Sequence, residues 1–390
     1  MTMRTKVYRY EPDYAVPPGE TLAEAIEAIG ISQAELARRS GLTRKHINRV
    51  ITGHAPLSAD TAIRLERVTG VGSTVWAALE ANYRTHVKRA QELAALRPQA
   101  DWLKSIPVRA LASRGALEHA RDSAVMLDRV LGFFGVSSLA AWRIEWESPR
   151  AIFRRSQSAV AHPGAVAAWI RLGEMQARRM ACSAYSEAKF RHALACARTL
   201  TSARPSAFFG RLQSLCADSG VALVLVPELP KAPVRGAARW LGPSNKAMIA
   251  LSPRFATSDA FWFSFFHEAG HVIMHSRRDG FVDTPEGHLK DHLESEADAF
   301  AARLLIPQDC EHELPSLHTA HAVKRFAAAI GVHPGIVVGR LQHERIVPRS
   351  ALNHLKIRLD WSALRKTALV LEAQGRISTA AGLGRHPRLR

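Results

Sequence analysis

Hydrophobic positions follow two different patterns along this chain. For most of its length, apolar residues recur at the spacing of amphipathic helices. Beyond Gly220 the pattern changes to short apolar runs bounded by glycine and proline, which predict strands over 221–226, 238–241 and 247–251. The predicted fold class is therefore mainly α-helical, with a small α+β domain.

Short helices with strong capping residues fill residues 21–84. The first is predicted over 22–29, and Ser73 is the predicted cap of the fifth. Ser32 and Glu35 have the spacing of a capping box, in which each side chain bonds the backbone N–H of the other residue. This motif predicts the start of the second helix.

The second and third helices have the signature of a helix-turn-helix unit. Gly41 ends the second helix, and Thr43 caps a third that runs to Ile51. Ile47 and Val50 would face inward together with Ile51. The side chains left on the outer face are Arg44, Lys45, Asn48 and Arg49.

That outer face suits the major groove of duplex DNA. Arginine can reach guanine edges, asparagine can reach adenine, and lysine can contact phosphates. We therefore predict DNA binding through Arg44, Lys45, Asn48 and Arg49. The alternative is a small helical interaction module whose charged face is merely solvated.

Composition supports a nucleic-acid partner and gives no sign of a membrane. The net charge is +18, and a strongly basic protein concentrates near polyanions; a coding bias towards arginine is the alternative explanation. No run of about 18 apolar residues predicts a membrane span, and the N-terminus lacks the apolar core of a signal peptide. The four cysteines have no C-x-x-C spacing and are typical of reduced thiols. We expect a cytoplasmic location.

Metal-binding chemistry is predicted by a helix-compatible segment over 259–276. His267 and His271 are four residues apart, so both imidazoles leave the same face and can bind one metal ion. Glu268 follows the first histidine, as in the H-E-x-x-H arrangement of zinc peptidases. In that chemistry the glutamate takes a proton from the attacking water and passes it to the leaving amine.

A catalytic zinc site needs a third protein ligand and one open position. The next predicted helix, over 289–304, carries Glu294 and Asp298 on one face. One of these carboxylates can bind zinc while the other fixes a ligand histidine through its second nitrogen. Glu296 lies on the other side of the helix and is expected to meet solvent. Rival ligands are His275, His288 and His292.

These segments resemble a known family. Phe-Trp-Phe-Ser-Phe-Phe-His-Glu-Ala-Gly-His, followed by Glu-Ser-Glu-Ala-Asp-Ala-Phe-Ala-Ala-Arg-Leu-Leu-Ile-Pro, is similar to the ImmA/IrrE (M78-like) metallopeptidases. The likeness extends through Gly331–Arg340. The N-terminal helices resemble the Xre-type helix-turn-helix of HigA-like antidote proteins, so the chain looks like a fusion of the two.

The resemblance implies a zincin-like fold and a zinc endopeptidase that cleaves a regulatory protein, often an Xre-type repressor, after stress or DNA damage. On the family pattern, His267 and His271 match the zinc-binding histidines and Glu268 the catalytic glutamate. The Glu-x-x-x-(Asn/Asp) element falls on Glu294 and Asp298. The resemblance implies that Glu294 is the third zinc ligand, and Asp298 is then the carboxylate that fixes a ligand histidine. Many relatives lack so long a helical middle region. The resemblance therefore does not identify the protein that is cut.

The expected organisation has five parts, and three functions remain in competition. The parts are an extension (1–17), a helix-turn-helix domain (18–84), a helical connector (85–205), a zinc metallopeptidase domain (206–312) and a C-terminal helical region (313–390). One alternative is a HigA-type DNA-binding antidote whose peptidase domain is a non-catalytic scaffold, although a scaffold has no need of Glu268. The other is a protease that DNA, including single-stranded DNA, activates. Homodimerisation is left open.

Overall fold

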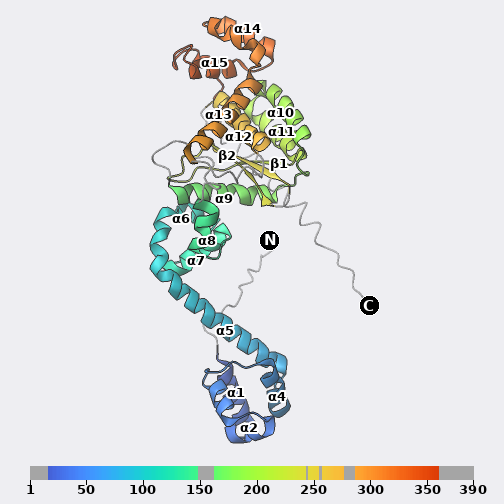
Figure 1. The fold of residues 1–390 in the computed structure, drawn as a ribbon, viewed down its shortest axis with the longest axis vertical. Helices are drawn as coiled ribbons and strands as arrows, with labels where there is room; N and C mark the ends of the chain where they lie inside the picture. The colour runs from blue at the N-terminus through green and yellow to red at the C-terminus, as the bar shows by residue number, and fades with distance from the viewer. Residues whose placement is uncertain (1–15, 148–161, 243–244, 254–256, 276–285, 360–390) are drawn as a thin grey trace, which may run out of the picture. The chain divides into compact units, whose positions relative to one another are not determined.

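A computed structural model describes residues 16–147, 162–242, 245–253, 257–275 and 286–359 (Figure 1). The chain divides into two compact units. The first comprises Met1–Asp101 and Ala120–Asp128, and the second comprises Trp102–His119 and Arg129–Arg390. Two of the three boundaries fall within η1 (Arg97–Ser105) and α7 (Ser123–Phe134), and the third follows His119 in the segment before α7.

The first unit is a bundle of short helices followed by one long helix. Its helices are α1 (Pro18–Ala28), α2 (Gln33–Ser40), α3 (Arg44–Ile51), α4 (Ala59–Thr69) and α5 (Ser73–Leu96). Their apolar faces meet in one core that includes Leu22, Leu36, Ile47, Leu65 and Trp76, each at most 1% exposed. The helix-turn-helix arrangement predicted for α2 and α3 is confirmed.

Helix caps in this unit follow the sequence only in part. Ser32 Oγ accepts the N–H of Glu35 at 3.2 Å, as predicted. The Glu35 carboxylate instead accepts hydrogen bonds from Arg38 and Arg39, about one turn further along the helix, so only half of the capping box forms. Thr43 Oγ1 accepts the N–H of His46 at 3.1 Å and caps α3 as predicted.

Two helix starts differ from the prediction. Helix α1 begins at Pro18 rather than near residue 22, because proline suits the first turn of a helix. Gly19 is needed there, since a Cβ atom on it would lie 2.3 Å from the carbonyl oxygen of Ile51. Ser73 does not cap α5; it is the first helical residue, and its N–H donates to Glu66 Oε2 at 2.6 Å.

The second unit combines a small sheet with many helices. Its α-helices are α6 (Val108–Ser113), α8 (Leu139–Trp142), α9 (Pro163–Arg179), α10 (Glu187–Thr199), α11 (Pro205–Asp218), α12 (Ser258–Met274), α13 (Glu286–Leu305), α14 (Ala320–Ile330) and α15 (Pro334–His343). Shorter turns are η2 (Arg143–Glu147), η3 (Leu200–Ser202), η6 (Gln308–Ser316) and η7 (Asn353–Leu355). The prediction of a mainly helical fold with a small α+β domain is confirmed.

The sheet is mixed and has the order β1-β3-β2. Strand β1 (Val221–Leu225) runs parallel to β3 (Ala247–Leu251), and β2 (Gly236–Trp240) runs antiparallel to β3. The prediction matches β3, runs one residue too far in β1, and starts β2 two residues too late. Gly236 pairs with Leu251 in the ladder. Pairing with β3 therefore extends β2 beyond its apolar run.

Helices cover both faces of the sheet, and α9 covers one of them (Figure 1). A Cβ atom on Gly173 of α9 would lie 3.2 Å from both Met248 and Ala250, so this glycine allows a close approach. The neighbouring β3 residues Ile249 and Leu251 point the other way, as alternation in a strand requires. Helix α9, in the stretch expected to be a connector, is thus part of the sheet's cover.

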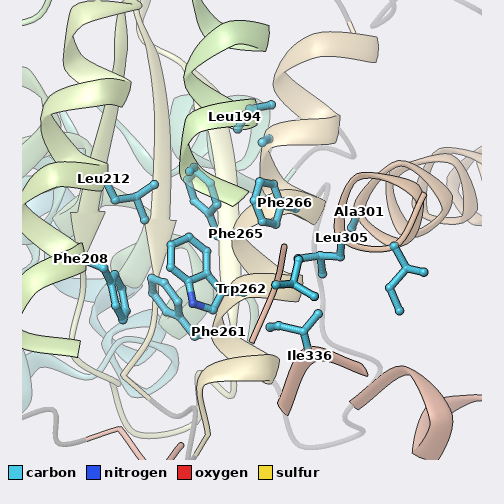
Figure 2. Close-up of a cluster of buried hydrophobic side chains, with 14 of the residues drawn as sticks. Leu194, Phe208, Leu212, Phe261, Trp262, Phe265, Phe266, Ala301, Leu305 and Ile336 are labelled. Carbon is cyan, nitrogen blue, oxygen red and sulfur yellow. The ribbon is translucent and has the colours of Figure 1, made fainter. Parts of the chain in front are cut away.

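The opposite face of the sheet packs on an aromatic core that holds α12 in place. Figure 2 shows its central side chains: Leu194, Phe208, Leu212, Phe261, Trp262, Phe265 and Phe266. The rings of Phe208 on α11 and Trp262 on α12 are 4.8 Å apart, and both side chains are at most 1% exposed. This core fixes the helix that carries the H-E-x-x-H motif.

One described segment, Ser123–Trp146, is long and apolar enough by length and composition to cross a membrane, since a window of 18 residues within it has a mean hydropathy of 1.5. Gly135 interrupts it with a left-handed φ of 72°. The rings of Trp142 and Trp146 lie 5.7 and 5.3 Å from that of Phe134. The two halves of the segment therefore pack against each other, as in the core of a folded domain.

Candidate metal centre

Helix α12 carries two buried ionisable side chains among its apolar residues. Its other buried positions are mostly aromatic or aliphatic, as in a helix enclosed by its domain. Glu268 is 3% exposed and His271 is 4% exposed. Burying such groups is costly unless they are bonded or have a ligand to bind, so both require a physical explanation.

Small residues let α13 approach α12 closely. A Cβ atom on Gly270 would lie 3.1 Å from the ring of Phe300 and 3.4 Å from the Cα atom of Ala297. Ala297 and Ala301 of α13 are fully buried. This close contact brings Glu294, one turn before Ala297, beside the two histidines of α12.

Three of the predicted site residues converge. His267 Nε2 lies 3.1 Å from His271 Nε2 and 3.2 Å from Glu294 Oε2. His271 Nε2 lies 3.6 Å from Glu294 Oε1. Ligand atoms of the three side chains all lie within 4.8 Å of one another, so a single metal ion could contact all three.

Asp298 contacts the far side of the first histidine. Its Oδ1 atom lies 2.7 Å from His267 Nδ1. A proton on Nδ1 donates to the carboxylate and leaves the lone pair of Nε2 free for a metal ion. Asp298 and Glu294 are one helical turn apart, so the structure places both carboxylates around His267.

The charges of this cluster shift the titration of its members. Burial alone would lower the pKa of His267, but hydrogen bonds to Asp298 and Glu294 outweigh it and raise the pKa to about 9. Burial alone would raise the pKa of Glu294, but its bonds to His267 and His271 hold that pKa far below its usual range. A divalent cation would replace the proton that the cluster otherwise holds.

Glu268 lies against strand β2 of the sheet. A Cβ atom on Gly236 of β2 would come within 2.7 Å of Glu268 Oε1 and 2.9 Å of its Cγ atom. The negative charge of Glu268 also contributes to the raised pKa of His267. The carboxylate is thus held close to the cluster without being one of its three converging groups.

His275, a predicted rival ligand, contacts a ligand instead of joining the cluster. Its Nδ1 atom lies 2.8 Å from His271 Nδ1, and its Nε2 atom lies 3.2 Å from Glu296 Oε2. Glu296 is exposed, as predicted, with 43% of its side chain open to solvent, and it contacts His275 as well. His292 Nδ1 lies 3.5 Å from Glu296 Oε2. The side chain of His288 lies outside the described residues.

One sequence signal points to the role of His275. It follows His271 by four residues, which puts both rings on one face of α12. The contact of Glu296 with His275 has no local signal, because it depends on how α13 docks on α12.

A hollow of about 400 Å³ lies beside the cluster, among α12, α13 and α15. The ring of Phe263 lies 6.4 Å from that of His267 and 6.4 Å from that of His343. Asp298 lines the hollow as well. Other lining residues include Ala299, Ala302, Ile336 and Arg340.

The predicted DNA-contacting residues all lie on the outer face of α3. Arg44, Lys45, Asn48 and Arg49 are exposed. Ile47 and Val50, by contrast, are buried in the core. Arg49 also donates a hydrogen bond to the carbonyl oxygen of His54 at 3.2 Å.

Comparisons with known protein families agree with the metal-binding cluster and with the helix-turn-helix unit. Residues 224–342 match the family Peptidase M78, described as the IrrE N-terminal-like domain, and this range contains the whole cluster. Residues 22–76 match the helix-turn-helix family HTH_3. The chain therefore joins a helix-turn-helix domain, of the kind found in DNA-binding regulators, to a peptidase-like domain in one polypeptide.

Similarity to individual proteins adds little. One solved structure that matches is described as an antidote protein of a plasmid maintenance system from Nostoc punctiforme. It is 26% identical over 20% of this chain and 94% of that chain, with a TM-score of 0.18. This TM-score is too low to indicate a shared fold. No curated protein matches the chain.

Proposed function

We propose that the protein is a cytoplasmic DNA-binding regulator that carries a zinc endopeptidase. The substrate is a regulatory protein, an Xre-type repressor, that is cleaved in response to stress or DNA. The observation that supports this most directly is the convergence of His267, His271 and Glu294 beside the buried Glu268.

The three converging side chains fit zinc. Donor atoms around a tetrahedral zinc ion lie about 3.3 Å apart, because zinc–nitrogen and zinc–oxygen bonds are roughly 2.0–2.1 Å long. The two histidine Nε2 atoms here are 3.1 Å apart, and they lie 3.2 and 3.6 Å from the two carboxylate oxygens of Glu294. Two histidines and one carboxylate leave a fourth position open for catalysis. A zinc ion bound there would act as a Lewis acid and would lower the pKa of water.

The chain's own residues then have separate roles. Asp298 accepts the Nδ1 proton of His267 and orients its ring. Glu268 accepts a proton from the water that attacks the peptide carbonyl and delivers it to the leaving amine. Gly236 leaves the space that this carboxylate occupies. His267, His271 and Glu294 would hold the metal ion.

The hollow beside Phe263 is suited to a substrate side chain near the scissile bond. Asp298, which contacts His267, lines it, and its wall combines apolar side chains with charged ones. Ala299→Trp should fill it. We expect this variant to raise KM for the protein substrate while zinc content stays the same, and an unchanged KM would remove the hollow from the proposal.

The helix-turn-helix unit would place the protease on duplex DNA through Arg44, Lys45, Asn48 and Arg49. The net charge of +18 favours contact with nucleic acid in general. Single-stranded DNA is therefore a second candidate activator. The cleavage experiment below tests both forms of DNA.

The test uses the full chain loaded with zinc, with and without single- or double-stranded DNA. Xre-type repressors are incubated with it, and fragments are identified by mass. We expect fragments with the wild type, and none with Glu268→Gln or after chelation. If no condition yields fragments that depend on Glu268, the protein is a DNA-binding antidote whose peptidase-like domain is a scaffold.

A further inference from the structure

The two histidines of the cluster differ in what their outer nitrogens contact. His267 Nδ1 meets the carboxylate of Asp298 directly, at 2.7 Å. His271 Nδ1 meets another imidazole, that of His275, at 2.8 Å. His275 Nε2 in turn lies 3.2 Å from Glu296 Oε2. Each histidine therefore connects to a carboxylate of α13, the first directly and the second through one ring.

Only one arrangement of hydrogens lets His271 bind a metal ion through Nε2. A ligand nitrogen needs a free lone pair, so the hydrogen of His271 must lie on Nδ1 and be donated to His275 Nδ1. His275 Nδ1 is then an acceptor, which places the His275 hydrogen on Nε2. That hydrogen points to a carboxylate oxygen of Glu296, which accepts it.

Burial makes this chain of contacts necessary for His271. Only 3% of its side chain is exposed, so bulk water has little access to its outer nitrogen. His275 is the C-cap residue that follows Met274, at φ −105° and ψ 92°, and it lies one turn beyond His271. It is 13% exposed and lies between the buried ring and the half-exposed carboxylate.

We propose that His275 and Glu296 are positioning residues that fix the ring and the hydrogen of His271 for metal binding. The inference rests on the proposed zinc site and extends it. The peptidase-like domain would then hold each ligand histidine by its own partner on α13: His267 by Asp298, and His271 by Glu296 through His275.

The test measures zinc affinity of the full chain by competition with a chromogenic chelator. His275→Phe keeps a ring but removes both nitrogens, and loss of such an outer partner costs about 10–100-fold in affinity. His275→Gln retains an acceptor for the His271 hydrogen and should keep part of the affinity. Glu296→Gln should lose less than His275→Phe.

The matched control is His292→Gln, because His292 contacts the same Glu296 oxygen from the exposed side. Its zinc affinity should equal that of the wild type. Cobalt-substituted proteins give a second readout, since an altered ring orientation shifts the visible absorption of the metal. Only the His275 and Glu296 variants should shift it.

The outcomes separate this inference from the proposed function. A wild type that binds no zinc overturns both. A wild type that binds zinc, with His275→Phe equally tight and spectrally unchanged, overturns the positioning role alone. A His275→Gln variant as weak as His275→Phe shows that the acceptor does not matter, and also overturns it.

Discussion

Gly236 leaves the space in which the Glu268 carboxylate lies. A Cβ atom on this residue of β2 would be 2.7 Å from Glu268 Oε1, closer than non-bonded carbon and oxygen atoms approach. The residues are 32 positions apart in the sequence and meet only because α12 packs on the sheet. The strand thus determines where the proposed catalytic base can point.

Gly236→Ala should therefore displace Glu268 without touching the metal ligands. We expect proteolysis to fall at least about tenfold, since an angstrom of misplacement of a reacting group costs that much or more. Zinc content, measured by elemental analysis, should not change. The double variant Gly236→Ala, Glu268→Gln should be no less active than Glu268→Gln alone, and a clear further loss would contradict the proposed link.

Glu268→Gln separates an enzyme from a scaffold. The amide has nearly the same shape but cannot accept the proton of the attacking water. Proteolysis of the repressor should fall by orders of magnitude, while zinc content and DNA affinity remain. If this variant behaves like the wild type in cells and Arg44 and Asn48 variants lose function, the DNA-binding antidote is the better account.

The metal-free protein should lose stability as the pH rises. The pKa of His267 is raised to about 9, because its bonds to Asp298 and Glu294 outweigh burial. Its charged form therefore stabilises the fold fully below the unfolded value of about 6.5, and the contribution disappears as the pH passes about 9. Melting temperatures across this range should fall.

His267→Ala provides the control for this pH effect. It should remove the slope attributed to His267, and it should also abolish tight zinc binding. Glu294→Ala should weaken zinc binding as well. If zinc binding survives Glu294→Ala but not Glu296→Ala, the third ligand has been assigned to the wrong carboxylate.

Gly270 sets the distance between the two helices of the metal centre. Its substitution by alanine places a Cβ atom 3.1 Å from Phe300, so α13 must move by a few tenths of an ångström. Gly270→Val should move it further. Zinc affinity should fall in the order Gly, Ala, Val, as measured with a chelator, and equal affinities would show that α13 docks without this contact.

The exposed face of α3 should determine DNA preference. Replacing Arg44 or Asn48 should cost about 1–3 kcal/mol for each lost base contact and relax the sequence preference. Lys45→Ala should weaken all duplexes evenly and lower the salt dependence. Titrations of the full chain at several salt concentrations measure both effects, and an absence of duplex binding at low salt would favour a helical interaction module.

Local spacing was enough to predict much of the site. His267 and His271 share a face because a helix repeats every 3.6 residues, whatever surrounds it. Thr43 caps α3 because its hydroxyl lies within reach of the His46 N–H in the same turn. The exposed and buried faces of α3 follow from the same periodicity. These features depend on neighbours within one or two turns of the chain.

Contacts between distant segments needed the folded structure. Glu35 matches a capping box, yet its carboxylate bonds Arg38 and Arg39, because the ion pairs compete with the cap. Glu296 was expected in solvent, and it is exposed, but it also contacts His275. This contact forms because α13 packs against α12 near the end of α12. Side-chain partners of this kind depend on helix packing, which spacing along one helix does not specify.

By itself, the sequence determined the helix that carries His267 and His271, the helix-turn-helix and the small group of strands. Each of these follows from hydrogen bonding and apolar periodicity within a few residues. The tertiary structure decided that Glu294 completes the cluster and that Gly236 lies against Glu268. Those relationships depend on the close approach of α13 to α12 at Gly270 and on the packing of α12 against β2, and packing joins residues that no local rule connects.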